Sequence, residues 1–156
     1  MVSLVFFVLG RAMQSGSRLE HAILREVAEW EEGFRITMRV LPHGPAMGWV
    51  KREGRLVHLG SPTAPPDLSI NFKNLECAFT MLTPQIGVCQ GFSEHRISVA
   101  GDLARCMSFV RCLNAVLILL YPQPVAARLV KRLPGKTPGL IMKRLHVVCL
   151  GIPFGR

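Results

Sequence analysis

Ser93, Glu94 and His95 are the residues whose types come nearest to a catalytic group, because serine, histidine and a carboxylate form hydrolase triads. Three adjacent residues, however, cannot converge on one reacting atom. Gly91 is the first glycine of a Gly-x-Ser-x-Gly turn around Ser93, but His95 stands where the second glycine is needed. We therefore interpret the three as solvated residues at the start of a strand, with no catalytic role.

A second pattern, Gly135-Lys136-Thr137, looks like the end of a phosphate-binding loop. The first glycine of such a loop falls on Val130, and the residues before it have a helical rather than a strand pattern. The pattern therefore does not indicate nucleotide binding.

Histidines and cysteines give no sign of a metal site or a cofactor. The histidines are scattered singly, with no ligand spacing. The five cysteines are odd in number and lack a Cys-x-x-Cys pair, which argues against zinc and against a disulfide framework. Cys89 and Cys106 are conceivable nucleophiles, but an isolated cysteine in apolar sequence is more often a small buried hydrophobe. The histidines are His21, His43, His58, His95 and His146, and the cysteines are Cys77, Cys89, Cys106, Cys112 and Cys149. We expect reduced cysteines, a cytoplasmic protein, no metal and no enzymatic activity.

Charge and hydropathy point to an apolar ligand or an anionic surface. The 156 residues are 49% hydrophobic, with a mean hydropathy of +0.31, which is high for a soluble chain of this length. Up to Asp102 there are 10 basic and 10 acidic residues, and after it 9 basic and none acidic. The whole excess of +9 therefore lies in the last third. Such asymmetry favours phospholipid headgroups or nucleic acid as a partner.

The central stretch, residues 66–121, has the most regular pattern. Residues 67–73 alternate apolar and polar side chains as a half-buried strand does, and residues 74–83 have helical spacing behind Asn74, a good N-cap. Residues 95–100 alternate again and predict another strand. Asp102 then begins a long helix that ends before Pro122. We expect the apolar faces of both strands to pack under the two helices. The stripe expected on the long helix is Leu103, Met107, Val110, Leu113, Asn114, Leu117 and Tyr121.

The preceding residues predict helices and a meander. The apolar run at residues 2–9 is too short to span a bilayer and predicts a packed helix, with a signal peptide as the alternative. Ser17 and Glu20 have the spacing of a capping box, which predicts a helix beginning there and ending at Gly33. Residues 34–40, 47–52 and 55–59 predict three antiparallel strands.

The order of these elements, together with Ala78-Phe79, Gln90-Gly91-Phe92 and Gly101-Asp102, resembles the sterol carrier protein type 2 family of lipid-binding domains. The resemblance covers residues 17–121. This sequence departs from the family pattern in the residues between Gly91 and the next strand, and in a basic extension at residues 122–156. Residues 1–156 are interpreted as a single domain.

The resemblance implies an α+β fold with a twisted, mainly antiparallel five-stranded sheet, helices over one face, and an apolar tunnel between them. Without it, plain core packing of the methionine and phenylalanine side chains is the better interpretation. With it, we expect non-catalytic binding and carrying of a fatty acyl, sterol-like or isoprenoid ligand, with a role in lipid or ubiquinone biosynthesis as its sharper form. The ligand-binding residues implied are Met38, Phe79, Leu82, Phe92, Met107 and Val110.

The basic extension predicts docking on an anionic membrane face, because residues 125–133 separate apolar and basic side chains onto two faces of a helix. The alternatives are a solvated basic face, a nucleic-acid-binding protein and a protein-interaction module. The docking residues expected are Arg128, Lys131, Arg132, Lys136, Lys143 and Arg144.

Overall fold

The computed structural model describes residues 2–83 and 85–120 of the chain. Five strands in this part form one sheet, in the order β3-β2-β1-β4-β5. Its central pair, β1 and β4, is parallel, and the other neighbours are antiparallel. The fold class predicted from the sequence, a mainly antiparallel five-stranded sheet in an α+β fold, is confirmed. The strands are β1 (Arg35–Val40), β2 (Ala46–Arg52), β3 (Arg55–Gly60), β4 (Leu68–Phe72) and β5 (Ile97–Ala100).

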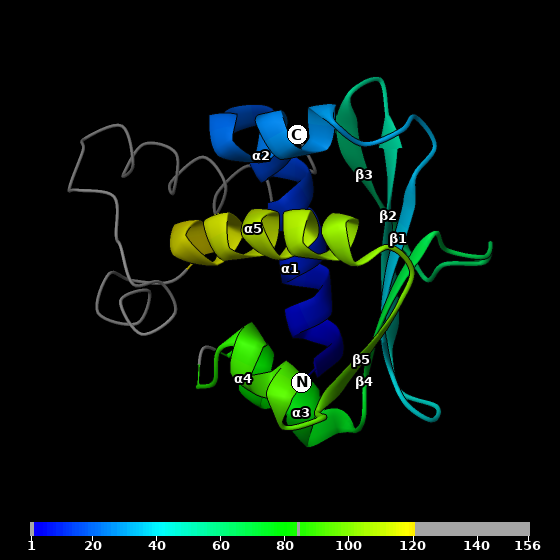
Figure 1. The fold of residues 1–156 in the computed structure, drawn as a ribbon, viewed down its shortest axis with the longest axis vertical. Coiled ribbons are helices and arrows are strands. Elements are labelled where there is room, and N and C mark those ends of the chain that lie inside the picture. Colours follow the sequence, from blue (N-terminus) through cyan, green and yellow to red (C-terminus); the bar gives the residue numbers. More distant parts are fainter. Residues whose placement is uncertain (1, 84, 121–156) are drawn as a thin grey trace.

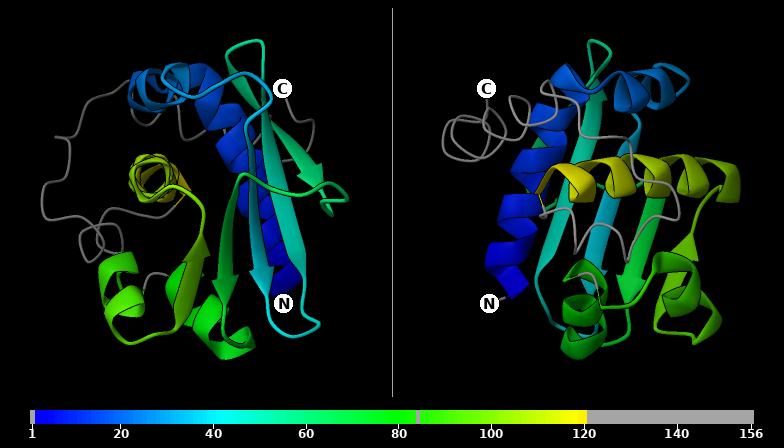
Figure 2. Two further views of the ribbon diagram at one scale, coloured as in Figure 1. Left: turned by 45° about the vertical axis from the view of Figure 1, so that its right-hand side comes forward. Right: turned by 90° about the vertical axis from the view of Figure 1, so that its left-hand side faces the viewer.

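The helices of the described residues cover one face of the sheet (Figures 1 and 2). Helix α1 packs on β2 and β3, while α5 lies across the face between α2 and the pair α3 and α4 (Figure 1). The sheet and the long helix α5 therefore face each other, and α3 and α4 lie beside them at one end of the sheet (Figure 1). The helices are α1 (Val2–Leu19), α2 (His21–Ala28), α3 (Leu75–Leu82), α4 (Val88–Ser93) and α5 (Leu103–Leu120).

The alternation of apolar and polar residues decides which face of β4 is buried. Leu68, Ile70 and Phe72 are at most 5% exposed and lie under the helices. Ser69 and Asn71 point to the opposite face, where the Ser69 hydroxyl donates to Asn71 Oδ1 over 3.1 Å. The predicted strand and its buried face are confirmed. An inward-facing serine or asparagine here would lose its hydrogen bonds to water and face apolar side chains that cannot replace them.

Aromatic side chains join the sheet to the helices. Trp49 of β2 and Phe109 of α5 are fully buried, with ring centroids 5.4 Å apart. The Trp49 indole also donates to the Gly10 carbonyl of α1 over 3.2 Å. Phe6 of α1 lies 6.2 Å from Phe72 of β4. The hydrophobic core therefore includes α1, most of which precedes the stretch that resembles the family.

The predicted capping box at Ser17 is wrong. Residues 2–9 are helical, as expected, but the helix continues through Ser17 to Leu19. The buried Ser17 hydroxyl donates to Gln14 O over 2.7 Å and accepts from the Leu56 amide of β3 over 3.3 Å. Glu20 is extended and precedes α2 without a side-chain cap. Ser17 therefore satisfies a strand amide, and the new helix begins at His21.

Two further boundaries differ from the sequence prediction. Helix α2 ends at Ala28 rather than at Gly33, whose φ of +85° instead belongs to the turn before β1. The strand expected from His95 begins at Ile97, and the residues before it form the unexpected helix α4. His95 has a φ of +55°, a conformation that ends α4 and is incompatible with a strand.

Helix α5 is the one described helix that is long and apolar enough to cross a membrane, with a mean hydropathy of 1.8 over 18 residues. Half of these residues are buried inside the fold. Phe109, Cys112 and Val116 are at most 1% exposed, whereas Leu103 and Met107 of the expected stripe are exposed. A helix that crosses a core is apolar over most of its circumference for the same reason as a membrane span. The last expected stripe residue, Tyr121, lies outside the described residues.

Candidate functional site

An apolar cavity of about 290 Å³ lies between the sheet and helices α3, α4 and α5. Strands β1, β4 and β5 form its floor, and one face of α5 forms its roof. No lining side chain in the described part of the chain carries an acid, an imidazole or an amine. The lining residues are Met38, Ile70, Phe72, Met81, Leu82, Val88, Phe92, Ile97, Val99, Leu103, Cys106, Met107, Val110 and Leu113.

Two sequence periods place these side chains together. In the strands, every second residue faces the helices, so Ile70 and Phe72 of β4 and Ile97 and Val99 of β5 share one surface. In α5 the lining residues recur at intervals of three and four, which is the spacing of one helix face. The cavity is therefore the space between an alternating strand surface and a helical stripe.

The mouth of the cavity has an apolar rim. Leu103, Phe92 and Met107 line the cavity and are 62%, 50% and 44% exposed. Exposed side chains of this size cost free energy in water unless a ligand or a surface covers them part of the time. Their gathering at an opening distinguishes this cavity from an ordinary packing defect.

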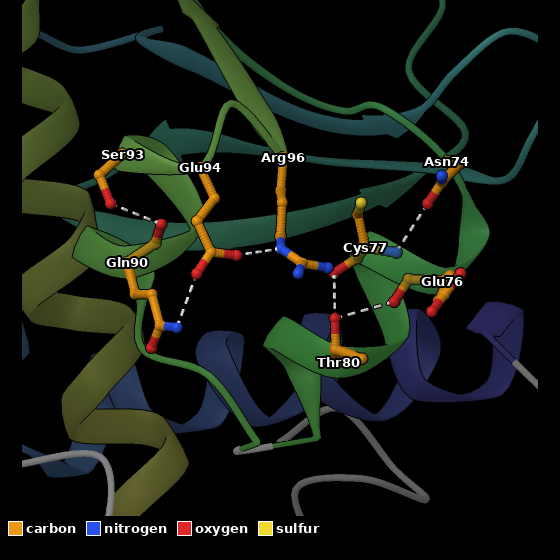
Figure 3. Close-up of polar contacts among 8 residues, drawn as sticks. All are labelled: Asn74, Glu76, Cys77, Thr80, Gln90, Ser93, Glu94 and Arg96. Atoms are coloured by element: carbon orange, nitrogen blue, oxygen red, sulfur yellow. Dashed lines mark hydrogen bonds and ion pairs between the residues drawn. The ribbon is translucent and has the colours of Figure 1, made fainter.

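Helices α3 and α4 are fixed by local polar contacts (Figure 3). Asn74 caps α3, as predicted, by accepting from the Cys77 amide over 2.8 Å. Thr80 donates to the Glu76 and Cys77 carbonyls within α3. Gly91 of α4 lies close to α3: a Cβ atom there would come within 2.5 Å of the Met81 sulfur, so the Met81 side chain would have to move. The two helices can therefore close one end of the cavity.

Ser93 and Glu94 make structural contacts (Figure 3). The Ser93 hydroxyl donates to Gln90 O over 2.9 Å, and Glu94 accepts from the Gln90 amide over 2.7 Å and from the Arg96 guanidinium. Hydrogen bonds from Gln90 and Arg96 lower the pKa of Glu94 from its ordinary value. These contacts hold α4 to the start of β5.

Cys106 is the cavity residue with the most reactive functional group. Its side chain is buried in the roof, and burial raises the pKa of the thiol above its ordinary value of 9.0. A nucleophilic cysteine requires a lowered pKa, because the thiolate is the reacting form. The environment of Cys106 is therefore that of a small buried hydrophobe.

The structure brings together most of the residues expected to bind ligand. Met38, Leu82, Phe92, Met107 and Val110 line the cavity. The remaining residue, Phe79, is half-buried against the core and is not among the lining residues. The expected membrane-docking residues, from Arg128 to Arg144, lie outside the described part of the chain.

Nine lining residues were not among the ligand-binding residues expected from the sequence. The strand alternation carried the signal for Ile70, Phe72, Ile97 and Val99, and the helical stripe carried it for Leu103 and Leu113. Met81 and Val88 had no such signal, because they depend on how α3 and α4 pack together. Cys106 lies three residues after Leu103 and four before Val110, so it belongs to the same face of α5, although the expected stripe did not include it.

Neither a family model nor a curated protein matches the chain by sequence. Solved structures do match its fold. One, described as a UbiJ-SCP2 ubiquinone synthesis protein, has a TM-score of 0.51 at 14% identity, covering 74% of this chain and 94% of the other. Another, the sterol carrier protein domain 2 of Helicoverpa armigera, has a TM-score of 0.50 at 13% identity, covering 78% and 87%. With its mixed sheet and with helices over one face of that sheet, the chain has the fold of a sterol carrier protein type 2 domain.

Proposed function

We propose that this protein binds an apolar, lipid-like molecule in the cavity between the sheet and α5, and carries or presents it without changing it chemically. The observation that carries the proposal is the cavity of about 290 Å³, lined by apolar side chains and opening at a rim of exposed Phe92, Leu103 and Met107. The fold that it shares with sterol carrier protein domains supports the same function.

Burial of apolar surface is enough for such binding. Each methylene group moved from water into an apolar cavity contributes ~0.8 kcal/mol, without any directional bond. The polar headgroup of a bound lipid would then stay at the mouth, because the described lining residues offer it no hydrogen-bonding side chain apart from a thiol. We therefore expect selection by size and shape rather than by headgroup.

A narrower form of the proposal concerns isoprenoid ligands. One solved structure of this fold is described as a ubiquinone synthesis protein. We propose that the ligand of this chain is an isoprenoid or quinone intermediate held for another enzyme. Native mass spectrometry of the purified protein, followed by organic extraction, measures which lipid accompanies it.

The test of the general proposal is to fill the cavity from its rim. Met107→Trp adds volume in the mouth of the cavity, whereas Leu75→Trp adds the same ring system to an exposed leucine at the start of α3 that does not line it. We expect Met107→Trp to weaken binding of a fluorescent fatty acid at least tenfold and to leave thermal stability almost unchanged.

Leu75→Trp is the matched control and should bind the fatty acid like the natural chain. Equal affinity in all three proteins would mean that the fatty acid does not occupy this cavity. If the natural chain does not bind the fatty acid at all, the proposed function itself is contradicted.

A further inference from the structure

A second apolar cavity, of about 150 Å³, lies between the first half of α1 and the end of α5. Leu82, the last residue of α3, is the one described side chain that lines both this cavity and the larger one. The residues that line the second cavity are Leu4, Val5, Val8, Leu9, Leu82, Leu117 and Leu120.

The two cavities follow each other along the same face of α5. Leu113 is the last α5 residue that lines the first cavity, and Leu117 is the first that lines the second. Four residues of helix span about 6 Å, so the two cavities occupy successive turns of one apolar stripe. Leu82 is only 2% exposed and stands where one cavity ends and the other begins.

We propose that Leu82 sets the length of the apolar chain that the protein accepts, by closing the inner end of the first cavity against the second. This inference rests on the proposed function and assigns the chain length of its ligand. An engineered cavity of about 150 Å³ holds benzene, which has six carbons. At the same volume per carbon atom, the first cavity holds about twelve carbons of an apolar chain and the second holds about six more.

The second cavity is then an unused extension of the binding site. Its side chains are apolar and continuous with the stripe of the first, so it matches the distal part of an alkyl or isoprenoid chain. A shorter side chain at position 82 would join the two spaces. Leu82 is therefore a specificity-determining residue: the size of its side chain decides how long an apolar chain the site accepts.

The experiment measures the affinity of the full chain for saturated fatty acids of 8 to 18 carbons, by displacement of a fluorescent fatty acid. Each buried methylene should improve the dissociation constant about fourfold. In the natural chain we expect this gain to stop at about twelve carbons, where the cavity ends. In Leu82→Ala the gain should continue to about eighteen carbons.

Two further variants separate chain length from general loosening of the fold. Leu56→Ala makes the same deletion at a fully buried leucine that lines neither cavity, and it should keep the natural limit. Val8→Trp fills the second cavity, so it should leave the natural limit unchanged and restore that limit in Leu82→Ala.

The outcomes are distinct from those of the proposed function. If no fatty acid of any length binds, the proposed function fails. If binding occurs but affinity rises evenly to eighteen carbons in the natural chain, Leu82 does not limit the ligand and this inference is overturned. An unchanged limit in folded Leu82→Ala overturns it as well. Should circular dichroism show Leu82→Ala to be unfolded, the smaller truncation Leu82→Val must shift the limit by one or two carbons.

Discussion

Lys51 shows how a single residue fixes the geometry of this fold. Its side chain is only 6% exposed, and its ammonium group donates to the Trp30 carbonyl over 2.6 Å and to the Ala28 carbonyl over 3.3 Å. These carbonyls belong to the end of α2 and the residues that follow it, which have no further helical turn to accept from. Glu32 lies 3.5 Å away and supplies the countercharge. A strand lysine thus completes the end of a helix.

We predict that Lys51→Met lowers the free energy of unfolding by about 1–3 kcal/mol, because the Ala28 carbonyl at the end of α2 and the Trp30 carbonyl just after it lose their donor. The methionine keeps most of the buried volume, so packing changes little. Urea unfolding measures the difference.

The neighbouring Arg52→Met removes the same charge from an exposed position and serves as the control. A surface substitution of this kind should change stability by less than about 0.5 kcal/mol. If both variants lose the same stability, the charge and not the carbonyl contacts explains the effect.

At the scale of elements, α2 holds α5 in place over the cavity. Arg111 of α5 donates to both carboxylate oxygens of Glu26, over 2.6 and 2.8 Å. The Ser108 hydroxyl donates to the same carboxylate over 2.7 Å and accepts from the Trp30 indole over 2.9 Å. This chain of hydrogen bonds connects the outer side of α5 to α2, while the inner side of α5 faces the cavity.

We predict that Glu26→Gln destabilises the protein by about 1 kcal/mol at neutral pH. Hydrogen bonds from Arg111 and Ser108 lower the pKa of Glu26 below its ordinary value of 4.5. A lowered pKa means that the folded state favours the carboxylate, so this stability is present above pH 4.5 and is lost as the pH falls through the folded pKa.

Chemical unfolding at a series of pH values tests this prediction. The difference between the natural chain and Glu26→Gln should shrink below pH 4.5 and vanish once Glu26 is protonated. Glu31→Gln, at an exposed carboxylate outside this network, is the control. A difference that stays constant down to low pH would show that the charge of Glu26 contributes nothing.

The elements that the sequence predicted well are those whose pattern repeats. Leu68, Ile70 and Phe72 alternate, and the buried face of β4 follows from that alternation alone. Helix α3 carried both a stripe and a cap at Asn74. In each case the local preference and the tertiary packing agree.

The elements that were missed depend on contacts between distant residues. A serine such as Ser17 can cap a helix, or it can lie inside one and donate its hydroxyl to a carbonyl of the preceding turn. The hydrogen bond that it accepts from the distant Leu56 amide favours the second arrangement. Helix α4 contains a glycine and only six residues, and its position depends on how it packs against α3. The second cavity is a product of how α1 and α5 lie together, which no local pattern records.

At the scale of the whole molecule, most of the net positive charge lies outside the part of the chain that holds the cavity. Up to Leu120 there are 12 basic and 10 acidic residues, and from Tyr121 onward there are 7 basic and none acidic. The part that holds the cavity is therefore nearly neutral, whereas the extension carries most of the net charge of +9. A carrier of apolar molecules must meet the membranes that supply and receive them, and a basic extension is suited to anionic lipid.

We propose that the extension docks the protein on anionic membranes through Arg128, Lys131 and Arg132, with Lys136, Lys143 and Arg144 beyond them. Each basic residue near an anionic leaflet contributes ~1 kcal/mol, which gives reversible attachment that salt weakens. Changing Arg128, Lys131 and Arg132 to Glu should therefore lower binding to vesicles that contain phosphatidylserine by about a hundredfold. Neutral vesicles should bind neither protein.

The control for this last prediction is a variant with the same change in net charge at exposed arginines of the sheet, Arg39, Arg52 and Arg55 to Glu. Co-sedimentation with vesicles measures both variants beside the natural chain. If attachment depends on the extension, only the first variant loses it, whereas equal losses would assign it to the total charge of the molecule. If the natural chain binds neutral and anionic vesicles equally well, electrostatic docking is contradicted, and the exposed apolar rim of the cavity becomes the surface to test.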